Sequence, residues 1–392
     1  MMRLGQVTPR PTFAPPFRGS GMAVTLVALA SASSILLASE GARAESMDPA
    51  LERLVHAAGA TSGPCNNPGD PGKYVTGAAP CSPDNGAFTR LINQYGFAFA
   101  PMAFYPARTT GYGGFQVGIQ AAYTSIDSDA EYWQKGTQGP KDPVTGQNSV
   151  KNNSPDSWLQ VYNLNLRKGL PFGFELGVNL GYMARTSIMS GGADVRWSLL
   201  EGFRTGLLGI LPDLSIGAGV RTITGTPQFQ LTVASGDAMI SKPIPIADSS
   251  IFTPYIGYQF IRIFGDSGLI DSTPNTDALG YCNYQGQKVP GGYDEMGKPP
   301  AGGYTGQPVC GDGTNRNGSP DDLNNTKVFQ RTRITRHRIV AGLSYRYEMI
   351  TIGGQFITDL IDPSSANTDA EAAALQSVTR QNTIALQIGS AF

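Results

Sequence analysis

The sequence feature that most constrains the fold is a strict alternation of side-chain character along residues 172–182. Every second residue is large and apolar, from Phe172 to Tyr182, and the residues between them are glycine, glutamate or asparagine. A period of two is typical of a β-strand whose two faces meet different surroundings. We therefore expect a strand with its apolar face outward and its small or polar face inward.

The same alternation recurs from about residue 111 onward. It marks nine further segments, at residues 115–123, 158–166, 193–199, 214–220, 229–233, 252–260, 339–347, 350–356 and 384–392. Together with the first they predict about ten strands, long enough for the roughly 9–11 residues of a tilted membrane strand. Beyond residue 44 no run approaches the roughly 18 consecutive apolar residues of a membrane-spanning helix. A chain of this kind can therefore span a membrane only as a closed barrel.

The spacing of the strands separates a barrel from a soluble β-sandwich, which alternates in the same way. Long connections follow odd-numbered strands and short ones follow even-numbered strands. The long ones are residues 126–156, 265–332 and 362–380, and the short ones are residues 168–171, 204–212 and 348–349. This parity is typical of large outer loops and tight periplasmic turns, and a sandwich gives no reason for it. We expect an all-β, antiparallel, up-and-down barrel that spans a membrane with ten strands, twelve being the alternative.

The N-terminal region reads as an export signal. Arg18 precedes an apolar run at residues 22–38, and the small-residue pattern of an A-x-A cleavage site ends at Ala44. We expect residues 1–44 to be a cleaved signal peptide, a retained membrane anchor being the alternative. Without them the net charge would be about −4, and no basic stripe suggests nucleic acid as a partner.

Residues 45–110 differ from the barrel that we expect at residues 111–392. Asp48 could cap a short helix that runs to Ala58 and contains His56. A Pro- and Gly-rich stretch follows, and residues 88–104 are apolar again. Strand parity starts this region in the periplasm, so that a plug inside the barrel, a periplasmic appendage and a tether all remain open.

The last segment ends in an aromatic residue that follows apolar residues at alternate positions. These positions are Ile384, Leu386, Ile388 and Phe392. The segment resembles the closing strand of bacterial outer-membrane β-barrel proteins, although Ser390 is polar where that superfamily usually has an apolar residue. The resemblance implies location in the outer membrane, with its lipid bilayer and the barrel-assembly machinery as partners. It assigns the superfamily and no particular transporter.

The inward face of the expected barrel carries charged residues among many glycines. They are Arg167, Glu175, Arg185, Asp194, Arg196, Arg221, Arg338 and Arg346. A barrel of ten strands is little wider than its side chains, so these charges could pair into a filled core. Their excess of arginine also permits a path that prefers anions. For Glu175, the nearest candidate partner in the strand order is Arg196.

The four cysteines form two local pairs in Gly- and Pro-rich stretches. Exported chains meet an oxidising compartment, so we expect disulfides between Cys65 and Cys81 and between Cys282 and Cys310. No cysteine has a second ligand at the spacing of a metal site.

Other chemistry is weakly indicated. Asn315, Asn317 and Asp321 have part of the spacing of a calcium loop, but a glycine stands at its first ligand position and a polar turn explains the same residues. Only two histidines are present, and His337 is expected to point outward on its strand. We therefore expect neither an enzyme nor a bound cofactor.

Two functions remain open at this point. The first is passive passage or binding of a small solute at the outer membrane. The second is a structural or surface-recognition barrel with a filled lumen, which acts through its outer loops and above all through residues 265–332.

Overall fold

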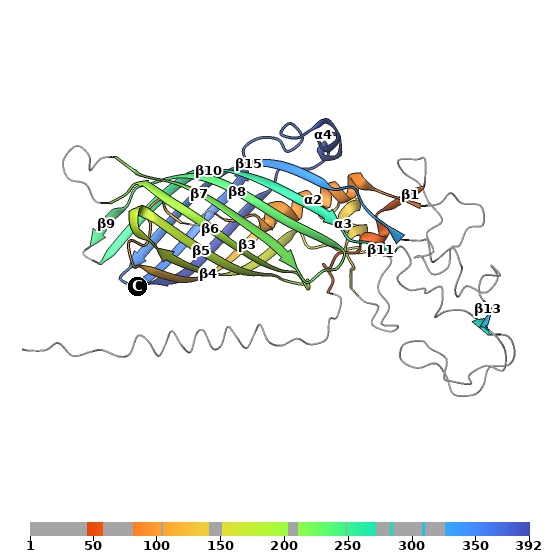
Figure 1. Cartoon of the computed structure of the whole chain (residues 1–392), viewed down its shortest axis with the longest axis horizontal. Coiled ribbons are helices and arrows are strands. Elements are labelled where there is room, and N and C mark those ends of the chain that lie inside the picture. The colour runs from red at the N-terminus through yellow and green to blue at the C-terminus, as the bar shows by residue number, and fades with distance from the viewer. Residues whose placement is uncertain are drawn as a thin grey trace, which may run out of the picture. The chain divides into compact units, whose positions relative to one another are not determined.

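The computed structural model contains a closed barrel (Figure 1). The structure describes residues 45–57, 81–102, 105–140, 151–202, 211–247, 249–271, 283–284, 308–309 and 326–392. Within these residues, ten strands form the barrel. They are β3 (Phe115–Ser125), β4 (Trp158–Gly169), β5 (Phe174–Met183), β6 (Met189–Leu200), β7 (Asp213–Thr224), β8 (Phe229–Ser241), β10 (Ser250–Ser267), β15 (Thr332–Tyr347), β16 (Ile350–Asp359) and β17 (Asn382–Ala391).

Each barrel strand pairs antiparallel with the barrel strands that precede and follow it in sequence. Strand β10 pairs with β15 across the long segment between them. The last strand, β17, pairs with the first, β3, and closes the barrel. There Phe115 and Phe392 exchange backbone hydrogen bonds of 3.0 and 2.8 Å. The predicted ten-stranded up-and-down barrel is confirmed.

The two ends of the barrel differ. At one end, which we call the turn end, the connections include η2 (Pro171–Gly173), the two residues between β15 and β16, and β9 (Ile244–Ala247), which pairs with β10. At the other, the loop end, lie α3 (Glu131–Gly136), α4 (Asp369–Leu375) and the short strand pairs β11 (Ile270–Asp271) with β14 (Thr326–Lys327) and β12 (Asn283–Tyr284) with β13 (Pro308–Val309). Outer-membrane barrels carry long loops outside and short turns in the periplasm, so we expect the loop end to face outward.

The exterior of the barrel is apolar, as the alternation predicts. Leu176 is 47% exposed and Leu386 is 58% exposed, although both are large aliphatic residues. Aromatic side chains lie among them toward the ends, where Phe174 and Trp197 stack with ring centroids 5.4 Å apart. A surface of this kind is stable when lipid covers it.

The helix expected from Asp48 to Ala58 is wrong. The chain makes one 3-10 turn, η1 (Leu51–Arg53), and then β1 (Val55–Ala57), which pairs with β2 (Cys81–Pro83). Asp48 does not cap a helix because its carboxylate accepts hydrogen bonds from the backbone N–H and the hydroxyl of Ser187, at 2.6 and 2.9 Å. His56 lies on β1 as a result.

A helix, α2 (Asn85–Phe99), follows β2 and lies inside the barrel near the loop end, where Figure 1 draws it in orange. Asp84 caps it, since its side chain accepts a hydrogen bond of 2.8 Å from the N–H of Ala87. From Ala87 to Phe99 all its residues except Arg90 are buried. The helix ends before Pro101, because a residue that precedes proline avoids the helical conformation. Among the described residues no helix is both long and apolar enough to cross a bilayer.

In one strand, β8, the apolar side chains that contact the helix face the lumen and not the exterior. Phe229, Leu231 and Val233 of β8 are at most 1% exposed and belong to the same core cluster as α2. The expectation that apolar residues of 229–233 face outward is therefore wrong. They face inward because α2 gives the lumen an apolar surface to pack against.

Candidate functional site

The described residues between β2 and β3 run through the lumen, and we call residues 84–102 and 105–110 the plug. At the loop end, Phe88, Leu91 and Tyr95 of α2 are fully buried in one apolar core with inward residues of the barrel wall. The contact is close at Gly96, where an added Cβ would overlap the side chain of Ile263 on β10. The half of the lumen at the loop end is therefore packed like a protein interior.

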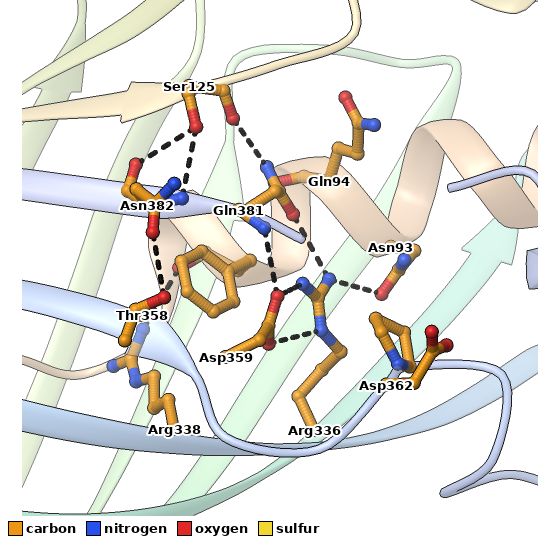
Figure 2. A network of polar contacts seen from close by, with 12 residues as sticks. Asn93, Gln94, Ser125, Arg336, Arg338, Thr358, Asp359, Asp362, Gln381 and Asn382 are labelled. Atoms are coloured by element: carbon orange, nitrogen blue, oxygen red, sulfur yellow. Dashed lines mark hydrogen bonds and ion pairs between the residues drawn. The ribbon is translucent and has the colours of Figure 1, made fainter. Parts of the chain in front are cut away.

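A buried ion pair joins the wall to the plug (Figure 2). Arg336 on β15 pairs with Asp359 on β16, and neither side chain has any exposed surface. The same guanidinium donates from Nη1 to Oδ1 of Asn93 on α2 at 2.8 Å and to Oε1 of Gln381 at 3.0 Å. We call these four residues the clamp. Buried charges persist where each has partners of this kind.

Gln381 extends the clamp to β3 and adds a second contact with α2. Its backbone N–H donates to Asp359 at 2.9 Å, and its side-chain amide donates to the carbonyl of Ser125 at 3.1 Å. The same amide reaches the carbonyl of Gln94 on α2 at 3.5 Å. Strands β3, β15 and β16 and the segment before β17 are thus tied to one side of the helix.

Arg338 satisfies the C-terminal end of α2. Its Nη1 donates to the carbonyl of Phe97 at 3.1 Å and its Nη2 to the carbonyl of Pro101 at 2.7 Å. Gln259 on β10 accepts from Nε of Arg338 at 2.7 Å and donates to Pro101 at 2.9 Å. Carbonyls at the end of a helix lack partners within it, and a cation beside them is stabilising.

The plug continues to the turn end. Nη1 of Arg196 on β6 donates to the carbonyls of Tyr105 and Pro106, at 3.0 and 3.1 Å. Ser241, at the turn end of β8, accepts from the N–H of Ala107 at 3.0 Å. Thr110 then donates from its N–H to Glu175 at 2.9 Å. The plug therefore enters at the loop end and leaves at the turn end, where β3 begins.

Some of the inward charged residues that the sequence predicts form ion pairs inside the barrel. Arg167 pairs with Glu175, and its guanidinium lies 3.4 Å from the ring centroid of Tyr105. Arg196 lies opposite Glu175 in the strand register, but it pairs with Asp237 at 3.5 Å. The candidate partner for Glu175 was therefore wrong, since the plug holds the guanidinium of Arg196 away from it.

Two members of the expected inward set lie at the ends of the barrel. Arg185 is in the turn after β5, where its side chain is 60% exposed and pairs with Asp156 at 2.5 Å. It does not face the lumen because the chain leaves the strand pattern there with a φ of 58°. Arg346 lies near the end of β15, exposed at the turn end, and its Nε donates to the carbonyl of Glu348 at 2.9 Å.

The last two residues of the expected inward set, Arg221 and Asp194, lie on the wall formed by β5, β6 and β7. Arg221 is 2% exposed, and its Nε and Nη1 have no hydrogen-bond partner among the described residues. Asp194 keeps part of its surface accessible although it is on the inward face, and its carboxylate lies against Gly177. Asn179 and Ser190 also keep unpartnered oxygens. Buried polar groups of this kind are usually satisfied by ordered water, which we expect here.

The sequence pattern did not predict the clamp. Arg336 has the same strand phase as Arg338, which was in the expected set. The alternation predicted that strand only from residue 339, whereas β15 begins at Thr332. The pattern of β15, followed further back toward the loop, would have included Arg336.

Several expected sites lie largely outside the described residues. Of the four cysteines only Cys81, at the start of β2, is described. Its pairing with Cys65, the pairing of Cys282 with Cys310, and the calcium candidates Asn315, Asn317 and Asp321 stay predictions, as does the signal peptide at residues 1–44. Among the described residues no group of three or more His, Cys, Asp or Glu side chains could hold a metal ion.

No protein-family model matches the chain, and no curated protein matches it. Solved structures that resemble it include Ail of Yersinia pestis in complex with the heparin analogue sucrose octasulfate, with 9% identity, a TM-score of 0.22 and coverage of 72% of this chain and 99% of that chain. OprG from Pseudomonas aeruginosa has 11% identity, a TM-score of 0.23 and coverage of 72% and 98%. The transport unit of the autotransporter AIDA-I from Escherichia coli has 9% identity, a TM-score of 0.30 and coverage of 79% and 98%.

The geometry of the chain itself is that of a bacterial outer-membrane β-barrel. The barrel is closed, so its strands present no open edge to lipid. Its exterior is apolar, and the exposed side chains of the closing strand, Ile384, Leu386, Ile388 and Phe392, belong to that surface. The chain is therefore an outer-membrane barrel protein with part of its own N-terminal region in the lumen.

Proposed function

We propose that this barrel does not conduct solutes, and that it acts at the outer face of the membrane through the segments that it holds there. The observation that carries the proposal is the plug, whose helix is buried from Ala87 to Phe99, except at Arg90, inside the outer half of the lumen. Passage of a solute would require the clamp, the Arg338 contacts and an apolar core to separate together. That combination favours the filled-lumen function over passive transport.

The segment before the plug supports the second part of the proposal. It is bound to three different loop-end connections. The N–H of Met47 donates to the carbonyl of Arg185 at 3.1 Å, and the N–H of Ala50 donates to the carbonyl of Gly136 at 2.9 Å. The N–H of Leu51 donates to Oε1 of Gln228 at 2.6 Å.

These contacts make residues 45–57 a brace between loops, which we call the outer brace. An ordered outer face is what a recognition surface needs, because loops already held in place lose less entropy on binding. In this proposal the barrel does no catalysis, and its partners are the bilayer, the assembly machinery and a ligand at the outer face.

Surface labelling of intact cells tests the proposal. An epitope inserted beside Glu45 should bind antibody on intact cells, because the outer brace lies at the loop end. The matched control is the same epitope at Glu348 in the turn between β15 and β16, which should bind antibody only after permeabilisation. Labelling of the Glu348 epitope on intact cells, with the Glu45 epitope hidden, would contradict the proposal.

A further inference from the structure

A cavity of about 250 Å³ opens at the turn end, between the last part of the plug and the barrel wall. The plug contributes residues 105, 106 and 108–110 to its lining, and the wall contributes residues of β3, β4, β10, β15, β16 and β17. We call it the turn-end cavity. Its volume is below the range of drug-sized sites, so it suits a small molecule.

The lining of the turn-end cavity carries an excess of positive charge. Arg108 comes from the plug, and Arg167 and Arg346 come from the wall. Arg167 is neutralised by Glu175. The one carboxylate in the lining, Glu201, accepts a hydrogen bond of 2.8 Å from the hydroxyl of Thr109. Among the described residues of the lining, the arginines thus outnumber the carboxylates, which favours an anion.

Hydrogen-bonding capacity in the lining is left unused. Arg167 is 4% exposed, and its Nε has no partner among the described residues. The hydroxyl oxygen of Thr351 accepts from Nε2 of Gln116 at 3.1 Å, which leaves its own hydrogen available to donate. These donors come from the wall, and the plug lines the opposite side of the cavity.

We propose that the turn-end cavity binds a small organic carboxylate from the periplasm. Guanidinium groups bind carboxylates through paired hydrogen bonds, and a hydroxyl donor beside them completes such a site. Because the plug and the wall both line the cavity, a bound carboxylate holds the part of the plug at the turn end to the barrel. This site is independent of the recognition surface proposed at the outer face.

Calorimetric titration of the folded barrel in detergent tests the site, with succinate as the probe. Succinate should bind once per chain and raise the unfolding temperature. Binding should weaken about tenfold or more in Arg346→Gln and in Arg108→Gln, since each removes a charged donor. Arg331→Gln, which removes an exposed arginine at the loop end, is the matched control and should bind as the wild type does.

Three results would overturn the proposal. They are no binding by a folded barrel up to about 10 mM succinate, equal binding in all the variants, and binding of inorganic phosphate with no binding of succinate. None of them bears on the outer-face epitope, so failure of this site and failure of the proposed function are distinguishable.

Discussion

Arg336 and Asp359 form an ion pair with no exposed side-chain surface, and the arginine also holds Asn93 of the helix inside the barrel. The pair therefore belongs both to the wall and to the plug. Its removal tests whether the plug is an integral part of the fold.

Loss of one partner from this pair should be more damaging than loss of both. Asp359→Leu leaves a buried arginine without its counter-charge, at a cost of about 3–5 kcal/mol in the free energy of unfolding. The double variant Arg336→Met with Asp359→Leu should recover much of that loss, because no charge stays buried. Denaturant unfolding in detergent measures both variants. Equal losses in the single and double variants would show that Arg336 reaches water and is not buried as described.

The contact of Gly96 with Ile263 predicts whether a substitution at residue 96 raises or lowers the stability of the barrel. Alanine is favoured over glycine in a helix by about 1 kcal/mol, but a Cβ at residue 96 would overlap Ile263. Gly96→Ala should therefore lower the unfolding temperature, since overpacking costs about 1–3 kcal/mol. In the control, Gly191→Ala, the added Cβ meets only Leu180 at 3.9 Å, and stability should hold or rise. A stabilised Gly96→Ala variant would mean that α2 does not pack against β10.

Substitution of two leucines tests whether the apolar residues of β8 face the lumen. Leu231 is fully buried against the plug, whereas Leu343 on β15 is 52% exposed and faces lipid. Leu231→Ala should cost about 2–5 kcal/mol through the cavity that it leaves. Leu343→Ala should cost less, because lipid can fill the space. Denaturant midpoints in detergent compare the two, and the opposite order would place residues 229–233 on the outside.

Neighbouring residues on β5 test the phase of the barrel. Leu176 faces lipid two residues from the start of β5, and an arginine on the lipid face costs about 2–4 kcal/mol at the bilayer midplane and less toward the interface. Leu176→Arg should therefore reduce the folded, heat-modifiable band on a gel. Glu175→Gln should keep that band but lower its transition temperature, because Arg167 loses its partner. A folded band that survives Leu176→Arg and disappears with Glu175→Gln would reverse the assigned phase.

The strands could be predicted from the sequence because lipid imposes a simple pattern on the exterior. The alternation around Leu176 and the terminal Phe392 predicted the barrel, its strand number and its closing strand. The same pattern misled at Phe229, since an inward apolar residue next to a plug has the same alternation as an outward one next to lipid. Periodicity alone does not distinguish these two apolar surroundings.

The plug and its contacts depend on long-range packing that alternation does not encode. Residues 88–104 read as apolar, but nothing local places a helix inside a lumen or sets the direction in which it threads. The partner of Glu175 illustrates the consequence. Register brings Arg196 opposite, yet the carbonyls of Tyr105 and Pro106 and the carboxylate of Asp237 hold its guanidinium instead. Side-chain pairing inside this barrel was set by the plug, whose position the sequence left open.

Planar-bilayer conductance of the purified, folded barrel tests the filled lumen most directly. The wild type should leave the bilayer conductance at its baseline, because the plug occupies the lumen from the loop end to the turn end. A variant that lacks residues 85–102, if its heat-modifiable band shows that it folds, should give open steps. Stable open steps from the folded wild-type barrel would contradict the account.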